Sequence, residues 1–186
     1  MIEVEKKAWL KDLEKTRKNI LKIATFTEKT EKEDIYFAPI MTERLNIYKD
    51  PIFRIRIEKG KQFLSYKKKS FRNKTEVNEE QEIDIAHIDL AFLRPFFQYL
   101  RFFPFIEKRK ETELYIMKNY QGFFVSIEIN QVEKLGDFVE IEILIESKDL
   151  IEKADQALSE IFEKIEISEE DIEEKYYVDL LMERNR

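Results

Sequence analysis

Apolar and charged residues alternate along several short segments of this chain, and this pattern constrains the fold more than any other feature. In FVEIEILIE (138–146), apolar residues occupy alternate positions, with Glu140 and Glu142 between them. Because successive side chains of a β-strand point to opposite faces, such a strand has one apolar and one charged face. The same alternation occurs in IEVEK, IFRIRIE, QFLSYKK and FFVSIEIN. The pattern predicts an antiparallel sheet whose apolar side is covered by helices.

The charged side chains are segregated by sign, strand by strand. The acidic pairs are Glu3/Glu5 and Glu140/Glu142, and the basic pairs are Arg54/Arg56 and Lys108/Lys110. A sheet with one solvated face is the simplest interpretation. If the sheet instead curls on itself, these groups line a lumen with a cationic wall, suited to a polyphosphate. Its acidic patch would then suit Mg²⁺ or Mn²⁺.

Composition narrows the chemistry that such a chain can perform. The 186 residues are 43% hydrophobic, enough for one domain with a core, and 39% are charged. There is no cysteine and a single histidine, His87, so thiolate and histidine chemistry are nearly excluded. The net charge of −6 argues against a general nucleic-acid binder. No segment resembles a signal peptide or membrane span, so we expect a cytoplasmic protein without membrane or nucleic-acid partners.

Helices are expected in four places besides the strands. Apolar spacing predicts a helix over 8–24, a second beginning after Ser147, and a last one that begins at Ser168 and ends near Leu181. Pro95 suits the first turn of a helix within the apolar segment 88–103. Residues 46–50 are expected to form a turn. The aromatic cluster at 96–105 is expected to be core or a partner surface, which makes a homodimer possible.

Motifs in a fixed order connect the chain with one family. Glu3-Val-Glu5-Lys-Lys7 has the form Glu-x-Glu-x-Lys, and later motifs are DIYF (34–37), FRIR (53–56), LSYK (64–67), KTE (74–76), KRK (108–110) and NQVEKLGDFVEIE (130–142). Together they resemble the CYTH superfamily, the triphosphate tunnel metalloenzymes. The segment YVDLL (177–181) resembles a C-terminal motif of its class IV adenylyl cyclase branch.

The resemblance implies an α+β fold: a closed antiparallel β-barrel around a triphosphate tunnel, with helices packed outside, in one domain over 1–186. It implies Mg²⁺ or Mn²⁺ as cofactor and a triphosphate substrate, ATP before others. The implied metal ligands are Glu3, Glu5, Glu140 and Glu142, and the implied triphosphate-binding residues are Lys7, Arg54, Arg56, Lys67, Lys74, Lys108 and Lys110. Glu3, Glu5 and Lys7 are the implied catalytic residues, and Glu76 is an accessory tunnel acid.

Some positions depart from the family pattern. Asn130 stands where the family has aspartate, and Glu128, two residues back on the same face, is expected to compensate as a metal ligand. If the register of a strand shifts by one residue, Arg109 could face the lumen in place of Lys110. Arg72 could likewise bind the triphosphate in place of Lys74.

The resemblance implies an adenylyl cyclase that converts ATP to 3′,5′-cyclic AMP and pyrophosphate. The alternatives are an inorganic or thiamine triphosphatase and a non-catalytic triphosphate-binding module.

Overall fold

The computed structural model describes residues 2–39, 51–72 and 74–185. Within them the strands are β1 (Ile2–Trp9), β2 (Thr25–Pro39), β3 (Phe53–Glu58), β4 (Lys61–Arg72), β5 (Thr75–Asp84), β6 (Phe102–Tyr120), β7 (Phe123–Val132) and β8 (Gly136–Ile145). The α-helices are α1 (Leu13–Ile20), α2 (Leu90–Tyr99), α3 (Ile151–Lys164) and α4 (Tyr177–Arg184).

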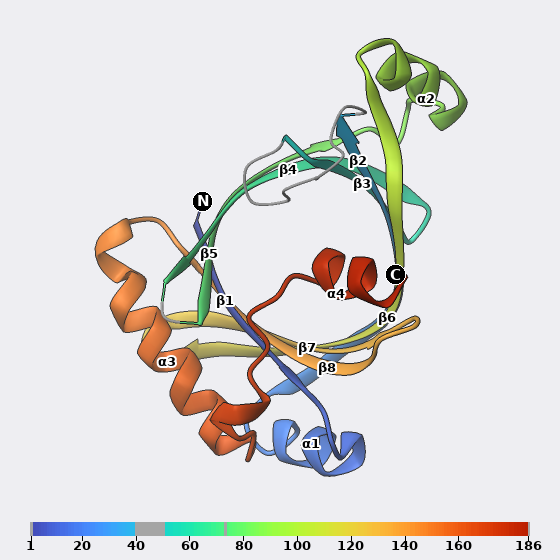
Figure 1. Cartoon of the computed structure of the whole chain (residues 1–186). Coiled ribbons are helices and arrows are strands. Elements are labelled where there is room, and N and C mark those ends of the chain that lie inside the picture. Colours follow the sequence, from blue (N-terminus) through green and yellow to red (C-terminus); the bar gives the residue numbers. More distant parts are fainter. Residues whose placement is uncertain (1, 40–50, 73, 186) are drawn as a thin grey trace.

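The strands form a closed barrel in the order β1-β5-β4-β3-β2-β6-β7-β8. Every neighbouring pair is antiparallel, including β1 with β8, which closes the ring. Figure 1 looks along the barrel and shows the ring of strands. The predicted closed antiparallel barrel is confirmed, and the alternative of an open sheet with one solvated face is excluded.

The barrel has its apolar side outward. On β8, Val139, Ile141, Ile143 and Ile145 are fully buried on the outer face, while Glu140 and Glu142 point into the lumen. The outer residues of β1, β6, β7 and β8 pack against α1 and α3 in the largest apolar core. The alternation seen in the sequence therefore places the charged groups together inside the barrel.

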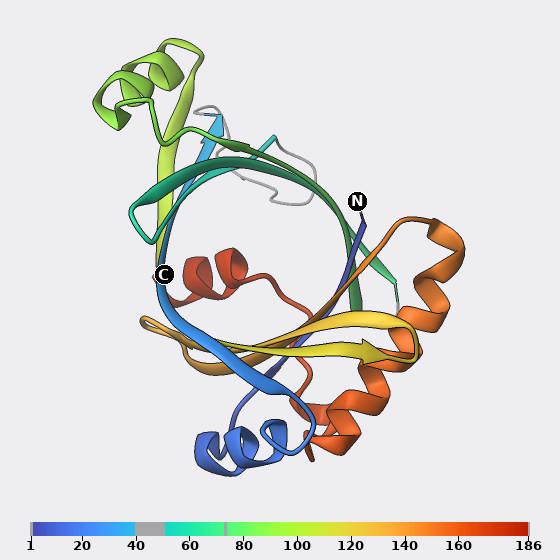
Figure 2. The same cartoon turned by 180° about the vertical axis from the view of Figure 1, so that it is seen from behind.

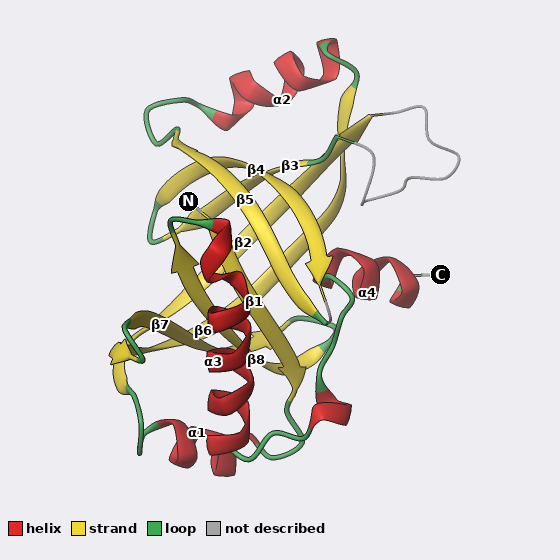
Figure 3. Ribbon diagram, turned by 90° about the vertical axis from the view of Figure 1, so that its left-hand side faces the viewer, coloured by secondary structure: helices red, strands yellow, loops and turns green. Residues whose placement is uncertain are grey.

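The helices lie outside the barrel wall, except that α4 lies across one end (Figures 1 and 3). The view from behind shows α1 and α3 on one side of the barrel and α2 on the other (Figure 2). Leu93 and Phe97 of α2 pack on the outer residues of β2 and β3, whereas Phe92, Phe96 and Tyr99 are exposed. The aromatic segment thus contributes both to the core and to the surface.

Several boundaries differ from the prediction. The helix expected over 8–24 occupies only α1, because β1 continues to Trp9 and Asp12 caps the helix. The last helix begins at Tyr177 rather than Ser168, and 169–171 form a 3₁₀ turn. Pro95 lies inside α2 rather than in its first turn. The turn expected at 46–50 lies outside the described residues.

No described helix combines the length and the apolar character that a membrane span requires.

Candidate active site

The charged strand faces surround a cavity of about 540 Å³ inside the barrel. The predicted site residues that line it are Glu3, Glu5, Lys7, Arg54, Arg56, Lys67, Glu76, Lys108, Lys110, Glu128, Glu140 and Glu142. These residues come from seven of the barrel strands. The tertiary structure therefore brings together groups that are far apart in the sequence.

Three carboxylates form a row across neighbouring strands. Glu5 of β1 lies directly opposite Glu142 of β8 and directly opposite Glu76 of β5. Like charges in such positions destabilise a sheet. Glu76 is neutralised by Lys7, whose Nζ lies 2.9 Å from Glu76 Oε1. Glu5 and Glu142 form no ion pair with any other residue that the structure describes.

The pKa values of these two carboxyl groups are raised, although the nearby charge of Lys67 acts in the opposite direction. Burial, together with the charges of Glu76 and Glu140, raises the pKa of Glu5 well above its usual range. Burial and the charge of Glu3 raise the pKa of Glu142 to about 7. Both groups would be stabilised in the charged form by a nearby cation.

The donor set of the row fits a divalent cation. Hard ions such as Mg²⁺ prefer carboxylate oxygens, and Glu5 and Glu142 lie directly opposite each other without an ion pair to any described residue. In the described part of the chain, no three acidic or histidine side chains already surround one point as ligands would. Glu3 and Glu140 instead form ion pairs, Glu3 with Lys67 at 2.7 Å and Glu140 with Lys110 at 3.2 Å.

The opposite wall of the lumen is cationic and is organised by Asp34. This carboxylate is fully buried and accepts hydrogen bonds from Arg56 Nε at 2.7 Å and Arg56 Nη2 at 3.0 Å. Lys108 Nζ lies 2.8 Å from Asp34 Oδ2, and Arg54 Nη1 lies 3.7 Å from it. Burial alone would raise the pKa of Asp34, but the three cations hold it well below its usual range. The sequence identifies DIYF only as a family motif and gives no sign of this role for Asp34.

Barrel closure sets the acidic row against this cationic wall. The row lies on β8, β1 and β5, and Asp34 with its partners lies on β3, β2 and β6. In the ring of eight strands, β1 and β2 are four places apart, which is the largest possible separation. A ligand between the two walls would contact both.

A second buried cluster shows that Lys110, and not Arg109, faces the lumen. Lys110 points into the lumen, where it lies 3.0 Å from Glu128 Oε2, while Arg109 is exposed and pairs with Glu33. Glu128 also lies 2.7 Å from Lys32 Nζ. Burial would raise the pKa of Glu128, but these two lysines hold it below the usual range. Glu128 therefore forms two ion pairs, whereas Glu5 forms none among the described residues.

Asn130 is fully buried beside Glu140. Its Nδ2 donates to Glu140 Oε2 at 2.7 Å, and its Oδ1 accepts from Thr112 Oγ1 at 2.7 Å. An aspartate in this place could not donate to Glu140. The departure from the family motif thus exchanges a charge for a hydrogen bond that positions another acid.

Lys74 does not line the lumen with the other predicted site residues. It is exposed in the turn between β4 and β5, has a positive φ of 61°, and lines a separate small hollow near α3. Its Nζ lies 3.9 Å from the carboxylate of Glu169. The structure therefore places this predicted phosphate ligand outside the tunnel. The side chain of Arg72, the alternative, lies outside the described part of the structure.

Two tyrosines beside or within α4 also line the lumen; the sequence pointed to Tyr177 only as part of the YVDLL motif, and it gave neither Tyr177 nor Tyr176 a place in the site. Tyr177 faces three lumen lysines, with its ring centroid 4.9 Å from Lys108 Nζ, 5.6 Å from Lys7 Nζ and 5.9 Å from Lys110 Nζ. Burial and the charge of Glu140 raise the pKa of Tyr177 well above its usual range, so the phenol stays neutral. Together with Tyr176 it lines the cavity and forms the wall at the α4 end.

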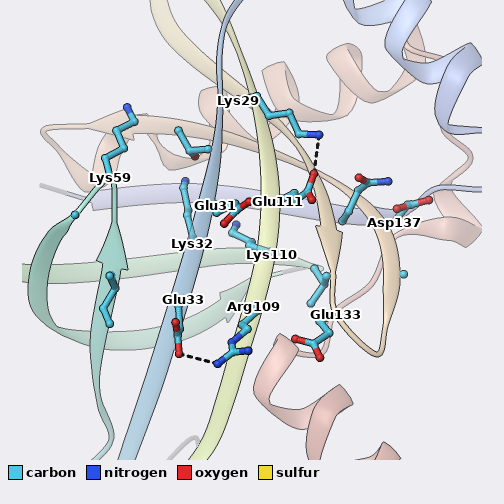
Figure 4. Close-up of a pocket in the computed structure, with 16 residues that line it drawn as sticks. Lys29, Glu31, Lys32, Glu33, Lys59, Arg109, Lys110, Glu111, Glu133 and Asp137 are labelled. Carbon is cyan, nitrogen blue, oxygen red and sulfur yellow. Dashed lines mark hydrogen bonds and ion pairs between the residues drawn. The ribbon is translucent and has the colours of Figure 1, made fainter.

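A larger hollow of about 1130 Å³ lies beside β2, β6 and the β7–β8 turn (Figure 4). Its charges neutralise one another: Lys29 lies 2.6 Å from Glu111 and Arg109 lies 3.2 Å from Glu33. Exposed pairs of this kind contribute little binding energy. In the lumen, by contrast, Glu5 and Glu142 are buried without an ion pair to any described residue.

The raised pKa of Glu142 predicts a specific pH dependence of stability in the absence of metal. The folded protein holds a proton on Glu142 up to pH of about 7, whereas the ordinary pKa of the group is 4.5. This contribution to stability is complete below pH 4.5 and is lost as the pH rises through 7. Glu142→Gln imitates the protonated form, so in EDTA its Tm should match wild type at pH 5 and exceed it by a few degrees at pH 8. A constant Tm difference between the two proteins across this pH range would contradict the assignment.

The barrel, the tunnel and the sequence define the class of protein. The sequence model of the CYTH domain matches residues 1–177, so the chain belongs to the CYTH family. Its fold is the triphosphate tunnel of that family, whose members use divalent metals and include adenylyl cyclase-like proteins and triphosphatases.

Individual relatives agree with this assignment. A Methanocaldococcus jannaschii protein named "Putative adenylate cyclase" is 32% identical over 181 residues, which cover 97% of this chain and 98% of the relative. A solved Pyrococcus horikoshii structure is 27% identical, with a TM-score of 0.80 over 98% of this chain and 99% of that one. A Hippeastrum protein, described as a "Putative adenylyl cyclase" that reveals a dominant triphosphatase activity, shares the fold at 13% identity and a TM-score of 0.67, over 98% of this chain and 95% of that one.

Proposed function

We propose that this protein is a metal-dependent enzyme that acts on triphosphates in its lumen, and that its reaction is the conversion of ATP to 3′,5′-cyclic AMP and pyrophosphate. One observation carries the proposal: the row of Glu76, Glu5 and Glu142 faces the cationic wall around Asp34 across one cavity. A chain of phosphates between these walls would compensate the cations, and a divalent ion would compensate the acids. The name of the M. jannaschii relative supports the cyclase reaction.

The cationic wall would hold the triphosphate. Arg54 and Arg56 remain charged at any relevant pH and can bind phosphate oxygens through two donors at once. Lys108 and Lys110 add charge from β6, and Lys7 and Lys67 add it from the acidic side. Each of the six forms an ion pair with a carboxylate, at distances of 2.7 to 3.0 Å, which a phosphate oxygen could replace.

The acidic row would hold the metal. Glu5 and Glu142 are the first candidates as ligands, with Glu3 and Glu140 on the same two strands. A bound Mg²⁺ or Mn²⁺ supplies positive charge for the phosphates and lowers the pKa of the ribose 3′-hydroxyl. In the proposed reaction, the 3′-hydroxyl would release its proton to water, the 3′-oxygen would bond to the α-phosphorus, and the bond from that phosphorus to the bridging oxygen of pyrophosphate would break. Lys and Arg side chains stabilise the charge that develops on the departing pyrophosphate.

The experiment identifies the reaction products instead of measuring only the loss of substrate. The full-length protein is incubated with ATP, thiamine triphosphate or tripolyphosphate, each with Mg²⁺, Mn²⁺ or EDTA. We expect cyclic AMP and pyrophosphate from ATP with metal, and no product with EDTA. Release of orthophosphate from any of the three would assign a triphosphatase instead. Binding without any product would assign a non-catalytic module.

The predicted homodimer, with the exposed face of α2 as its interface, remains a proposal. Phe92 is 68% exposed and Tyr99 is 84% exposed, which is high for aromatic residues of a helix.

A further inference from the structure

At the end opposite α4, the side chains on the lumen side of the barrel change from charged to apolar. Along β8, Phe138 contacts Tyr177 of α4, with ring centroids 4.9 Å apart, and Leu144 lies at the other end of the strand. Leu144 lies directly opposite Glu3 and lines the cavity. The lumen-facing side of β8 thus continues from acidic residues to an apolar one toward the open end.

Two neighbouring strands show the same change. Leu114 of β6 lies opposite Glu128, and Phe124 of β7 lies two residues before Ser126, which lies opposite Glu142. Since residues two apart in a strand share a face, both belong to the lumen side. Val125 lies opposite Ile143, so Phe124 lies next to Leu144 across β7 and β8. Leu114 lies on the next strand beside Glu128, at the level of Glu140. We call Leu114, Phe124 and Leu144 the rim ledge.

The rim ledge is not part of the apolar core. Leu144 is 46% exposed and Phe124 is 56% exposed, while Val125 and Ile143, adjacent to them in sequence, are fully buried on the outer face. None of the three ledge residues belongs to a core cluster among the described residues. Packing within the barrel therefore does not explain why these positions are apolar in a lumen that is otherwise charged.

We infer that the rim ledge binds the flat organic group of the substrate, so that the protein takes a nucleoside triphosphate rather than inorganic tripolyphosphate. This inference rests on the proposed function. Tyr176 and Tyr177 line the cavity at the α4 end and Leu144 lines it at the other end, so an organic group attached to the phosphate chain would meet the rim ledge there. There, Leu144 follows Glu142 by two residues on the same face, next to the acids proposed to hold the metal. A purine ring buries apolar surface on leucine and phenylalanine, which an inorganic phosphate chain cannot do.

The test compares two ligands on one variant. Phe124→Ser combined with Leu144→Ser removes the exposed apolar groups without touching a charged residue. Dissociation constants for ATP and for tripolyphosphate are measured by calorimetry with the intact protein. We expect the ATP constant to rise about tenfold or more and the tripolyphosphate constant to change less than twofold. Ile83→Ser is the matched control, because Ile83 is 63% exposed on the outer face of β5 and should affect neither ligand.

The outcomes separate this inference from the proposed function. If the double variant weakens both ligands equally, or weakens neither, the rim ledge does not select the organic group and the inference is overturned. If the wild-type protein binds neither ATP nor tripolyphosphate, the proposed function fails and the inference fails with it. A thermal melt of the double variant within a few degrees of wild type excludes unfolding as the cause.

Discussion

Replacing Glu5 with glutamine is expected to lower metal-dependent turnover at least about 100-fold while the protein stays folded. Glutamine keeps the size of the side chain and removes its charge, so the row on β8, β1 and β5 loses its central carboxylate. Because Glu5 has no ion-pair partner among the described residues and faces two other acids, the metal-free variant should be at least as stable as wild type. Turnover of ATP, the dissociation constant for Mn²⁺ and the Tm with and without Mn²⁺ are the measurements.

The control for this variant is Glu31→Gln. Glu31 is an exposed carboxylate of β2 beside the outer hollow in Figure 4, and it should affect neither turnover nor Mn²⁺ binding. A Glu5→Gln protein that turns over ATP at the wild-type rate would remove Glu5 from the metal site. A variant with normal Mn²⁺ affinity and no turnover would instead assign it a role after metal binding.

The alternation in the sequence was sufficient to predict which face of each strand is charged. Period-two patterns are local, so Glu3, Glu5, Arg54 and Arg56 could be assigned to the lumen side before any strand was paired. A lumen exists only if the sheet closes, and the alternation alone does not predict closure. The resemblance to a known family predicted it. Neither the pattern nor the resemblance showed that Glu5 lies opposite both Glu76 and Glu142, because register between distant strands depends on the whole barrel.

The site residues that the sequence did not reveal were missed for one reason: their positions depend on contacts between distant parts of the chain. Asp34 is a single acid in the apolar segment DIYF, and only the register of β2 with β3 and β6 places it among Arg54, Arg56 and Lys108. Tyr177 lies beyond the last strand, and its role depends on how α4 crosses the end of the barrel. Lys74 shows the converse error, since motif order suggested a lumen position that the turn between β4 and β5 does not provide.

Replacing Asp34 with alanine is expected to lower the free energy of unfolding by about 3–5 kcal/mol, because it leaves buried cations without their shared counter-charge. Arg54, Arg56 and Lys108 all depend on this one carboxylate for part of their neutralisation, and Asp34 is fully buried. The same variant should be stabilised more strongly by tripolyphosphate than wild type is, since the added anion then replaces the missing charge. Urea denaturation of both proteins, with and without tripolyphosphate, measures the two effects together.

The matched control is Glu33→Ala, the adjacent residue on the outer face of β2. Glu33 pairs with Arg109, whose side chain is 61% exposed, so its loss should cost less than about 1 kcal/mol and should not depend on tripolyphosphate. If Asp34→Ala were as mild as this control, the cations of the wall would not need Asp34, and its place among them would be incidental. If the loss were large but tripolyphosphate restored no more stability than it adds to wild type, Asp34 would support the barrel without organising a phosphate-binding wall. The combination of a large loss and a large restoration is expected only when the same cations bind both Asp34 and the triphosphate.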